Sequence, residues 1–166
     1  LVIGAGAWGC AISSALHANG NDVTIYHHKQ EFIETLSNTK KHPSLPKFIF
    51  NNEIKLTSST DSFFSADYVF IAIPTQSIRS FLNDANFNPN TNIISLSKGI
   101  EKETNKLPSE IIHDCTNLDE ANICALSGPS HAEEVSCNIP TTIVVAGPNM
   151  TLNRKIQKLL SSTNLR

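Results

Sequence analysis

The sequence lacks the features that mark several large classes of protein. Its 13 Lys and Arg face 15 Asp and Glu, a net charge of −2, so no broad positive surface indicates nucleic acid or an anionic membrane. No apolar run approaches the ~20 residues of a membrane-spanning helix. The four cysteines show no C-x-x-C spacing and no disulfide-rich density, so we expect reduced thiols and a cytoplasmic location.

The six histidines show no spacing typical of a metal site. His27 and His28 are adjacent, and neighbouring side chains on a strand point to opposite faces. We therefore expect no metal ion.

The length and composition fit one globular domain over residues 1–166, with 40% hydrophobic and 17% charged residues. Leu1 already lies inside the first expected strand, and the last residues stop where a further strand is expected. We expect the sequence to be a piece of a longer protein.

Strands and helices alternate along the whole chain, which predicts an α/β fold: a doubly wound, mostly parallel Rossmann-type sheet with helices on both faces. The expected strands are 1–3, 22–26, 54–57, 68–73, 92–96, 122–126 and 142–146. The expected helices are 8–19, 29–38, 75–86, 105–115, 131–137 and 150–162. Residues 38–52, with Pro43 and Pro46, predict an irregular surface loop.

The most informative motif is a glycine-rich turn, Gly4-Ala-Gly6-Ala-Trp-Gly9, between the first strand and the first helix. Gly4 allows a tight turn, Gly6 lets the backbone approach a pyrophosphate, and Gly9 lets the helix pack closely on the sheet. The N–H groups and the positive dipole end of the helix then face the anion. We expect Gly20 to close this helix. The turn predicts a dinucleotide site.

The second strand is followed by His28 and Lys29, where an NAD site usually has an acidic residue that bonds the ribose 2′-hydroxyl. The first acid here is Glu31. A basic pair suits a 2′-phosphate, which favours NADP over NAD, with NAD possible. The alternative is a solvated basic turn.

The fourth strand is followed by Pro74, which ends it, and by Thr75, which we expect to cap the next helix. We expect Arg79 to be a solvated helix residue.

The fifth and sixth strands are followed by residues suited to a polar ligand. Lys98 is placed to meet an anionic or carbonyl oxygen, although an ordinary exposed lysine is equally compatible with the spacing. Ser130 and Glu133 predict a capping box at the start of a helix, a position that can also bind an anion. His131 has no visible carboxylate partner, so we expect a packing or solvent-facing role.

Five strings occur in a distinctive order: GAGAWG at 4–9, PTQSIR at 74–79, SKGIE at 97–101, LSGPSHAEEV at 126–135 and PTTIVVA at 140–146. Together they resemble the N-terminal, cofactor-binding domain of bacterial NAD(P)-dependent glycerol-3-phosphate dehydrogenase, and the resemblance spans essentially the whole chain. It implies hydride transfer between NAD(P)H and dihydroxyacetone phosphate, which gives sn-glycerol 3-phosphate for phospholipid synthesis.

The resemblance also assigns roles to single residues. Besides the three glycines, it implies cofactor contacts from Ala7, Trp8, His28, Lys98 and Ala132. It implies substrate contacts from Lys98, Gly128 and Ser130. In this family the general-base lysine and the groups that bind the substrate phosphate belong to a helical C-terminal domain, which would begin beyond Arg166. We therefore expect this chain to contain no catalytic base and to turn over little substrate alone, although the full-length protein is a possible homodimer.

Three alternatives remain open. The chain could belong to another two-domain dehydrogenase acting on a sugar acid, sugar nucleotide or ketoacid, or it could be a non-catalytic nucleotide sensor. An S-adenosylmethionine-dependent methyltransferase is the third, although such folds usually have an acid after the second strand.

Overall fold

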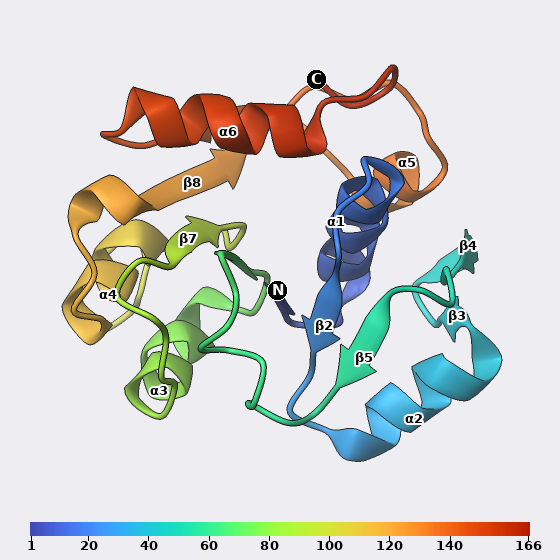
Figure 1. Cartoon of the computed structure of the whole chain (residues 1–166), viewed down its shortest axis with the longest axis horizontal. Coiled ribbons are helices and arrows are strands. Elements are labelled where there is room, and N and C mark those ends of the chain that lie inside the picture. The colour runs from blue at the N-terminus through green and yellow to red at the C-terminus, as the bar shows by residue number, and fades with distance from the viewer.

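The computed structural model describes residues 1–166 and contains a seven-stranded sheet between two layers of helices (Figure 1). Across the sheet the strands are β5 (Lys55–Thr57), β2 (Thr24–Tyr26), β1 (Val2–Ile3), β6 (Tyr68–Ile71), β7 (Asn92–Ser95), β8 (Ile123–Ser127) and β9 (Val144–Ala146). All neighbouring pairs are parallel except β8 with β9. The expected doubly wound α/β fold is confirmed.

The last strand departs from the expected parallel run, because β9 lies antiparallel to β8 with Ser127 opposite Val144. A parallel connection requires a crossover that returns the chain to the end of the sheet where the preceding strand began. Here the intervening helix α5 (Ala132–Ser136) packs on α1 (Ala7–Ala18) instead, so the chain re-enters the sheet at the edge where β8 ended.

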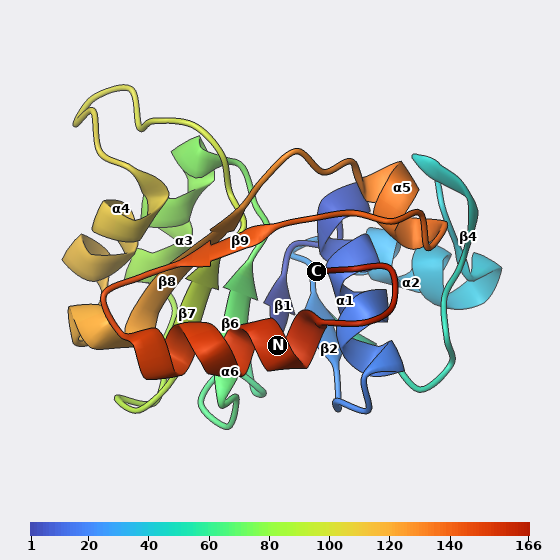
Figure 2. The same ribbon diagram turned by 90° about the horizontal axis from the view of Figure 1, so that it is seen from above.

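The two faces of the sheet carry separate apolar cores. α1, α5 and α6 (Met150–Leu160) cover one face (Figure 2), and Leu152, Ile156 and Leu160 are the buried stripe of α6. α3 (Ile78–Asn83) and α4 (Pro108–Cys115) cover the other, where Ile78 and Ile111 pack on the central strands. α2 (Gln30–Thr39) lies beside β5. Two short 3-10 helices are η1 (Thr75–Ser77) and η2 (Glu120–Asn122).

Local sequence explains several helix boundaries. Asn149 Oδ1 accepts the N–H groups of Thr151 (3.0 Å) and Leu152 (3.2 Å) and so caps α6. Pro108 occupies the first turn of α4, where its missing N–H has no consequence. Gly20 follows α1 with φ +82°, as expected for a helix end. None of the helices has both the length and the apolar character needed to cross a membrane.

The expectation of an irregular loop over residues 38–52 is wrong. β3 (Lys41–His42) and β4 (Leu45–Ile49) form a small antiparallel hairpin whose Phe48 side chain is buried in the core. Prolines suggested a loop, but Pro46 is tolerated because β4 pairs with a strand on one side only.

Candidate functional site

The sheet reverses its winding direction between β1 and β6. From β1 the chain adds β2 and β5 on one side, and it then returns to add β6, β7 and β8 on the other. In open α/β sheets, ligands bind at such a switch point, beyond the carboxyl ends of the strands. The glycine turn after β1 and the segment after β6 meet there.

The backbone of the glycine turn requires glycine at two positions. Gly4 has φ +109°, and a Cβ on it would lie 2.5 Å from the carbonyl oxygen of Ala72. A Cβ on Gly9 would lie 2.0 Å from the carbonyl oxygen of Gly4. Gly6, in contrast, faces open space, and a Cβ on it would meet no atom within 4 Å. The turn is therefore a close-packed cradle with one bare side.

The bare side presents hydrogen-bond donors. Gly6 is the N-cap of α1 and no side chain caps this helix, so the N–H groups of its first turn lack intrahelical acceptors. The indole of Trp8 packs against the apolar core, and its Nε1 is buried away from the cavity. Free backbone N–H groups at a helix N-terminus suit a pyrophosphate.

A cavity of about 520 Å³ opens beside this turn. Its lining combines the turn with residues that follow β2 and β6 and with one side of α3. The lining residues are Ile3, Gly4, Gly6, Tyr26, His27, His28, Ala72, Ile73, Pro74, Ser77, Ser80, Phe81 and Asp84. The structure thus brings His28 to the same cavity as Gly4 and Gly6, as the sequence pattern requires.

The two histidines do not point to opposite faces, so that expectation is wrong. β2 ends at Tyr26, and beyond it the rings of His27 and His28 stack with centroids 4.5 Å apart. His27 Nδ1 accepts the N–H of Lys29 at 3.1 Å. Partial burial lowers the pKa of His27 below its ordinary value, and the nearby charges of His28 and Lys29 lower it further.

A second polar group forms where β7 and β8 end. Lys98 is exposed, and its Nζ donates to the carbonyl oxygen of Gly128 at 3.1 Å. Ser130 Oγ donates to the same carbonyl at 3.4 Å. The expected capping box is wrong, because His131 is the N-cap of α5 and no side chain caps the helix. The Ser130 hydroxyl lies beside Gly128 instead, and Ala132 begins the helix.

Two expectations for the segment after β6 are also wrong. Thr75 does not cap a helix: it lies inside η1, and its hydroxyl donates to the carbonyl of Lys98 at 2.8 Å. Arg79 is not a solvated residue: it pairs with Glu101 and Asp114. Both contacts join segments more than 20 residues apart, which no local pattern reveals.

His42 is a site residue that the sequence pattern did not reveal. It is 6% exposed, and its Nδ1 accepts the N–H of Ser44 at 3.1 Å, so Nε2 carries the proton and donates to the carbonyl of Ala5 at 3.1 Å. Burial lowers the pKa of His42. The hairpin of β3 and β4 therefore stabilises the glycine turn through the hydrogen bond from His42 to Ala5. A buried histidine within an apparent loop is the signal that could have indicated this role.

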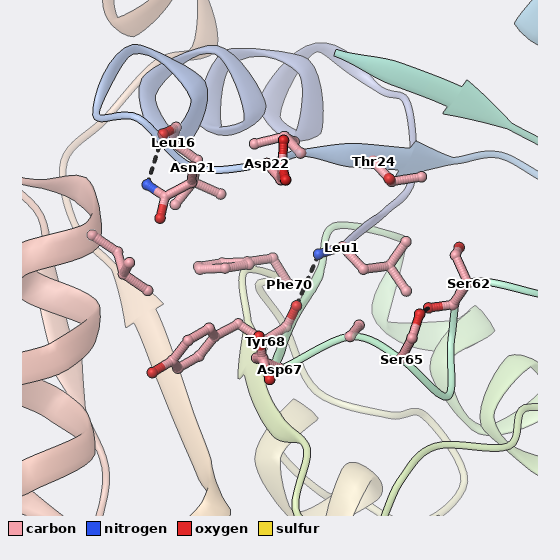
Figure 3. A pocket seen from close by; sticks show the side chains of 13 residues that line it. Leu1, Leu16, Asn21, Asp22, Thr24, Ser62, Ser65, Asp67, Tyr68 and Phe70 are labelled. Atoms are coloured by element: carbon pink, nitrogen blue, oxygen red, sulfur yellow. Dashed lines mark hydrogen bonds between the residues drawn. The ribbon is translucent and has the colours of Figure 1, made fainter. Parts of the chain in front are cut away.

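Another cavity, of about 450 Å³, opens at the opposite edge of the sheet (Figure 3). There Asn21, Asp22 and Thr24 face Asp67 and Tyr68. It lies at the amino ends of the strands and contains neither the glycine turn nor Lys98. We therefore place the functional site at the carboxyl edge.

Residues 1–153 match the family described as NAD-dependent glycerol-3-phosphate dehydrogenase N-terminus. The chain belongs to this family. It is the NAD(P)-binding N-terminal domain of a glycerol-3-phosphate dehydrogenase, and the glycine turn, the unpartnered donors of the first helical turn and the adjoining cavity fit such a cofactor.

Relatives match this glycerol-3-phosphate dehydrogenase domain along nearly its whole length. The chain is 35% identical over 168 residues to the NAD(P)+ glycerol-3-phosphate dehydrogenase of Oceanobacillus iheyensis, covering 99% of this chain and 49% of that protein. It is 39% identical over 167 residues to that of Geobacillus kaustophilus, covering 95% and 47%. A crystal structure of glycerol-3-phosphate dehydrogenase from Coxiella burnetii shares the fold, with a TM-score of 0.86 at 22% identity over 99% of this chain and 51% of that one. The chain spans about half the length of these relatives.

Proposed function

We propose that this chain binds NADP, with NAD as the weaker ligand, as the cofactor half of an enzyme that interconverts dihydroxyacetone phosphate and sn-glycerol 3-phosphate. The observation that carries the proposal is the cavity shared by the glycine turn and His28. Gly4, Gly6, Ala7, Trp8 and Gly9 would hold the pyrophosphate at the start of α1.

The ribose side of the cavity supports the preference for NADP. The cavity includes His28, and Lys29 follows directly, while the first carboxylate after β2 is Glu31. A 2′-phosphate needs donors and positive charge, whereas a 2′-hydroxyl is usually bound by an acid.

The group at the ends of β7 and β8 supports the assignment of the substrate side. Lys98 supplies a positive charge, Gly128 and Ser130 lie within hydrogen-bond reach of one another, and Ala132 would face the cofactor from the start of α5. When bound, the nicotinamide supplies or accepts the hydride. Lys98 would orient the reacting oxygen by hydrogen bonding.

The proposal assigns no catalytic base to residues 1–166. The resemblance implies that a lysine in a helical C-terminal domain beyond Arg166 holds and moves the proton. The complete enzyme would act in the cytoplasm, which fits the four free cysteines here, and as a homodimer.

Titration with NADPH and NADH tests the cofactor assignment in the chain as it stands. We expect His28→Ala to weaken NADPH about tenfold, the equivalent of one charge-assisted hydrogen bond, with NADH affected less than about threefold. His113→Ala is the matched control, since His113 is exposed on α4 and outside the cavity. Equal weakening of both cofactors would contradict the role of His28.

Turnover tests the substrate assignment, in a longer chain that includes residues 1–166 and the expected C-terminal domain. We expect NADPH oxidation with dihydroxyacetone phosphate and none with sugar nucleotides or ketoacids. Absence of turnover with the triose phosphate would overturn the assignment, and binding of NADPH without any turnover would favour a sensor.

A further inference from the structure

Polar contacts tie the loop after β7 to the segment after β6. Thr75 Oγ1 donates to the carbonyl of Lys98 at 2.8 Å. Gln76 contacts the same loop twice: its Nε2 donates to the carbonyl of Ile100 at 2.8 Å, and its Oε1 accepts the N–H of Lys102 at 3.1 Å. Hydrogen bonds thus fix the backbone of this loop from Lys98 to Lys102.

A two-pronged ion pair fixes the end of this stretch. Arg79 donates from Nε to Glu101 Oε1 at 3.0 Å and from Nη2 to Oε2 at 2.8 Å. Glu101 is only 7% exposed, and the Thr104 hydroxyl donates to it as well. Arg79 also reaches Asp114 of α4 at 3.2 Å. A planar guanidinium that binds both carboxylate oxygens fixes direction as well as distance.

The lysine that begins the stretch is held quite differently. Its backbone carbonyl is bound by Thr75, but its side chain is exposed, and its Nζ donates one hydrogen bond, to the carbonyl of Gly128. A lysine amine on its flexible stem has no geometry of its own. Its place over the sheet edge therefore depends on where the loop holds the Cα atom.

We propose that Arg79 and Glu101 are positioning residues that direct Lys98 Nζ towards the mouth of the site. The inference rests on the proposed function, in which Lys98 contacts cofactor and substrate. Neither Arg79 nor Glu101 lines the cofactor cavity, so they act through the loop. Pro74 and Ser77 do line the cavity, so the segment 74–79 both contributes to the cavity wall and contacts the loop that carries Lys98.

The reactivity of Lys98 tests the positioning directly and needs no enzymatic activity. Trace acetic anhydride with mass spectrometry gives the labelling of Lys98 relative to Lys155, an exposed residue of α6 in the same molecule. We expect Arg79→Gln and Glu101→Gln to raise this ratio at least about threefold, because the released loop loses the modest hydrogen bond to Gly128. Arg154→Gln, which removes an exposed arginine of α6, should leave it unchanged.

Thermal unfolding identifies which variants fold, and Glu101→Gln, which preserves size and one acceptor, decides the test should Arg79→Gln not fold. An unchanged labelling ratio in a folded variant overturns the proposal.

A double-mutant cycle on NADPH affinity separates positioning from general stability. We expect Arg79→Gln to weaken NADPH in the wild-type background and to have no further effect in Lys98→Ala. Additive losses would overturn the proposal. If Lys98→Ala alone leaves NADPH affinity unchanged, the proposed role of Lys98 in binding fails, and the labelling ratio alone decides whether Arg79 and Glu101 position its side chain.

Discussion

At the end of β1 the backbone determines the shape of the site, whereas at the end of β7 side chains of η1, α3 and α4 determine it. The glycine turn owes its form to Gly4 and Gly9, where a Cβ would collide with nearby carbonyl oxygens. The Lys98 loop owes its form to Arg79 and Glu101, which are 22 residues apart. The form of the first region depends on residues close together in the sequence, whereas the form of the second depends on contacts between distant segments.

The largest expected effect breaks the rigid side of this comparison. Gly9→Ala puts a Cβ 2.0 Å from the carbonyl of Gly4, a backbone atom that cannot rotate away. We expect a loss of about 3 kcal/mol or more in the free energy of unfolding, at or beyond the upper end of ordinary overpacking. Denaturant titration measures it.

Gly6→Ala is the matched control for this prediction, because a Cβ there meets nothing within 4 Å. It should leave stability within about 0.5 kcal/mol while weakening NADPH, since the methyl group occupies the bare side of the cradle. Equal stability of the two variants would show that the turn is not close-packed.

A smaller effect depends on pH and involves two buried thiols, Cys10 on α1 and Cys124 on β8. Burial raises the pKa of Cys10 and of Cys124 from 9.0 to about 12. Because the folded-state pKa lies above the unfolded value, the stabilising contribution is complete below pH 9 and is lost as the pH rises towards 12. We expect a loss of about 1 kcal/mol per thiol by pH 10.

Unfolding measured between pH 7 and 10 checks this dependence. The double variant Cys10→Ala/Cys124→Ala should flatten the part of the curve above pH 9, whereas Cys137→Ala, at an exposed position, should not. A curve that stays as steep in the double variant would assign the alkaline loss to other groups.

An effect of similar size concerns His42, whose imidazole donates to the glycine turn at the carbonyl of Ala5. His42→Phe fills a similar volume but leaves the carbonyl of Ala5 with only the weak Cys10 thiol donor at 3.4 Å, at a cost of about 1 kcal/mol. Thermal unfolding together with NADPH titration measures it. We expect His42→Gln, which retains an N–H donor, to recover part of the loss, and no difference between the variants would exclude the hydrogen bond as the reason.

Local spacing predicted the form of the glycine turn and of several elements, whereas contacts between distant segments and some helix boundaries did not follow from it. The glycine turn, the apolar stripe of α6 and the strand-end position of His28 follow from spacing within a few residues. Prolines predict a loop where the structure has the hairpin of β3 and β4, because proline is tolerated on a strand that pairs on one side only. Ser130 matched a capping pattern, yet the helix begins after His131.

By itself, the sequence determined that a dinucleotide fold would form and where its ligand edge would lie, because glycine conformations and hydrophobic alternation act over neighbouring residues. Only the tertiary structure shows that Arg79 forms an ion pair with Glu101 and that His42 donates a hydrogen bond to the carbonyl of Ala5. It also shows that β9 pairs antiparallel with β8. Those outcomes depend on which distant groups come into contact when the helices pack on the two faces of the sheet. Such contacts depend on the charge, polarity and shape of groups that only folding brings together, so spacing along the sequence does not predict them.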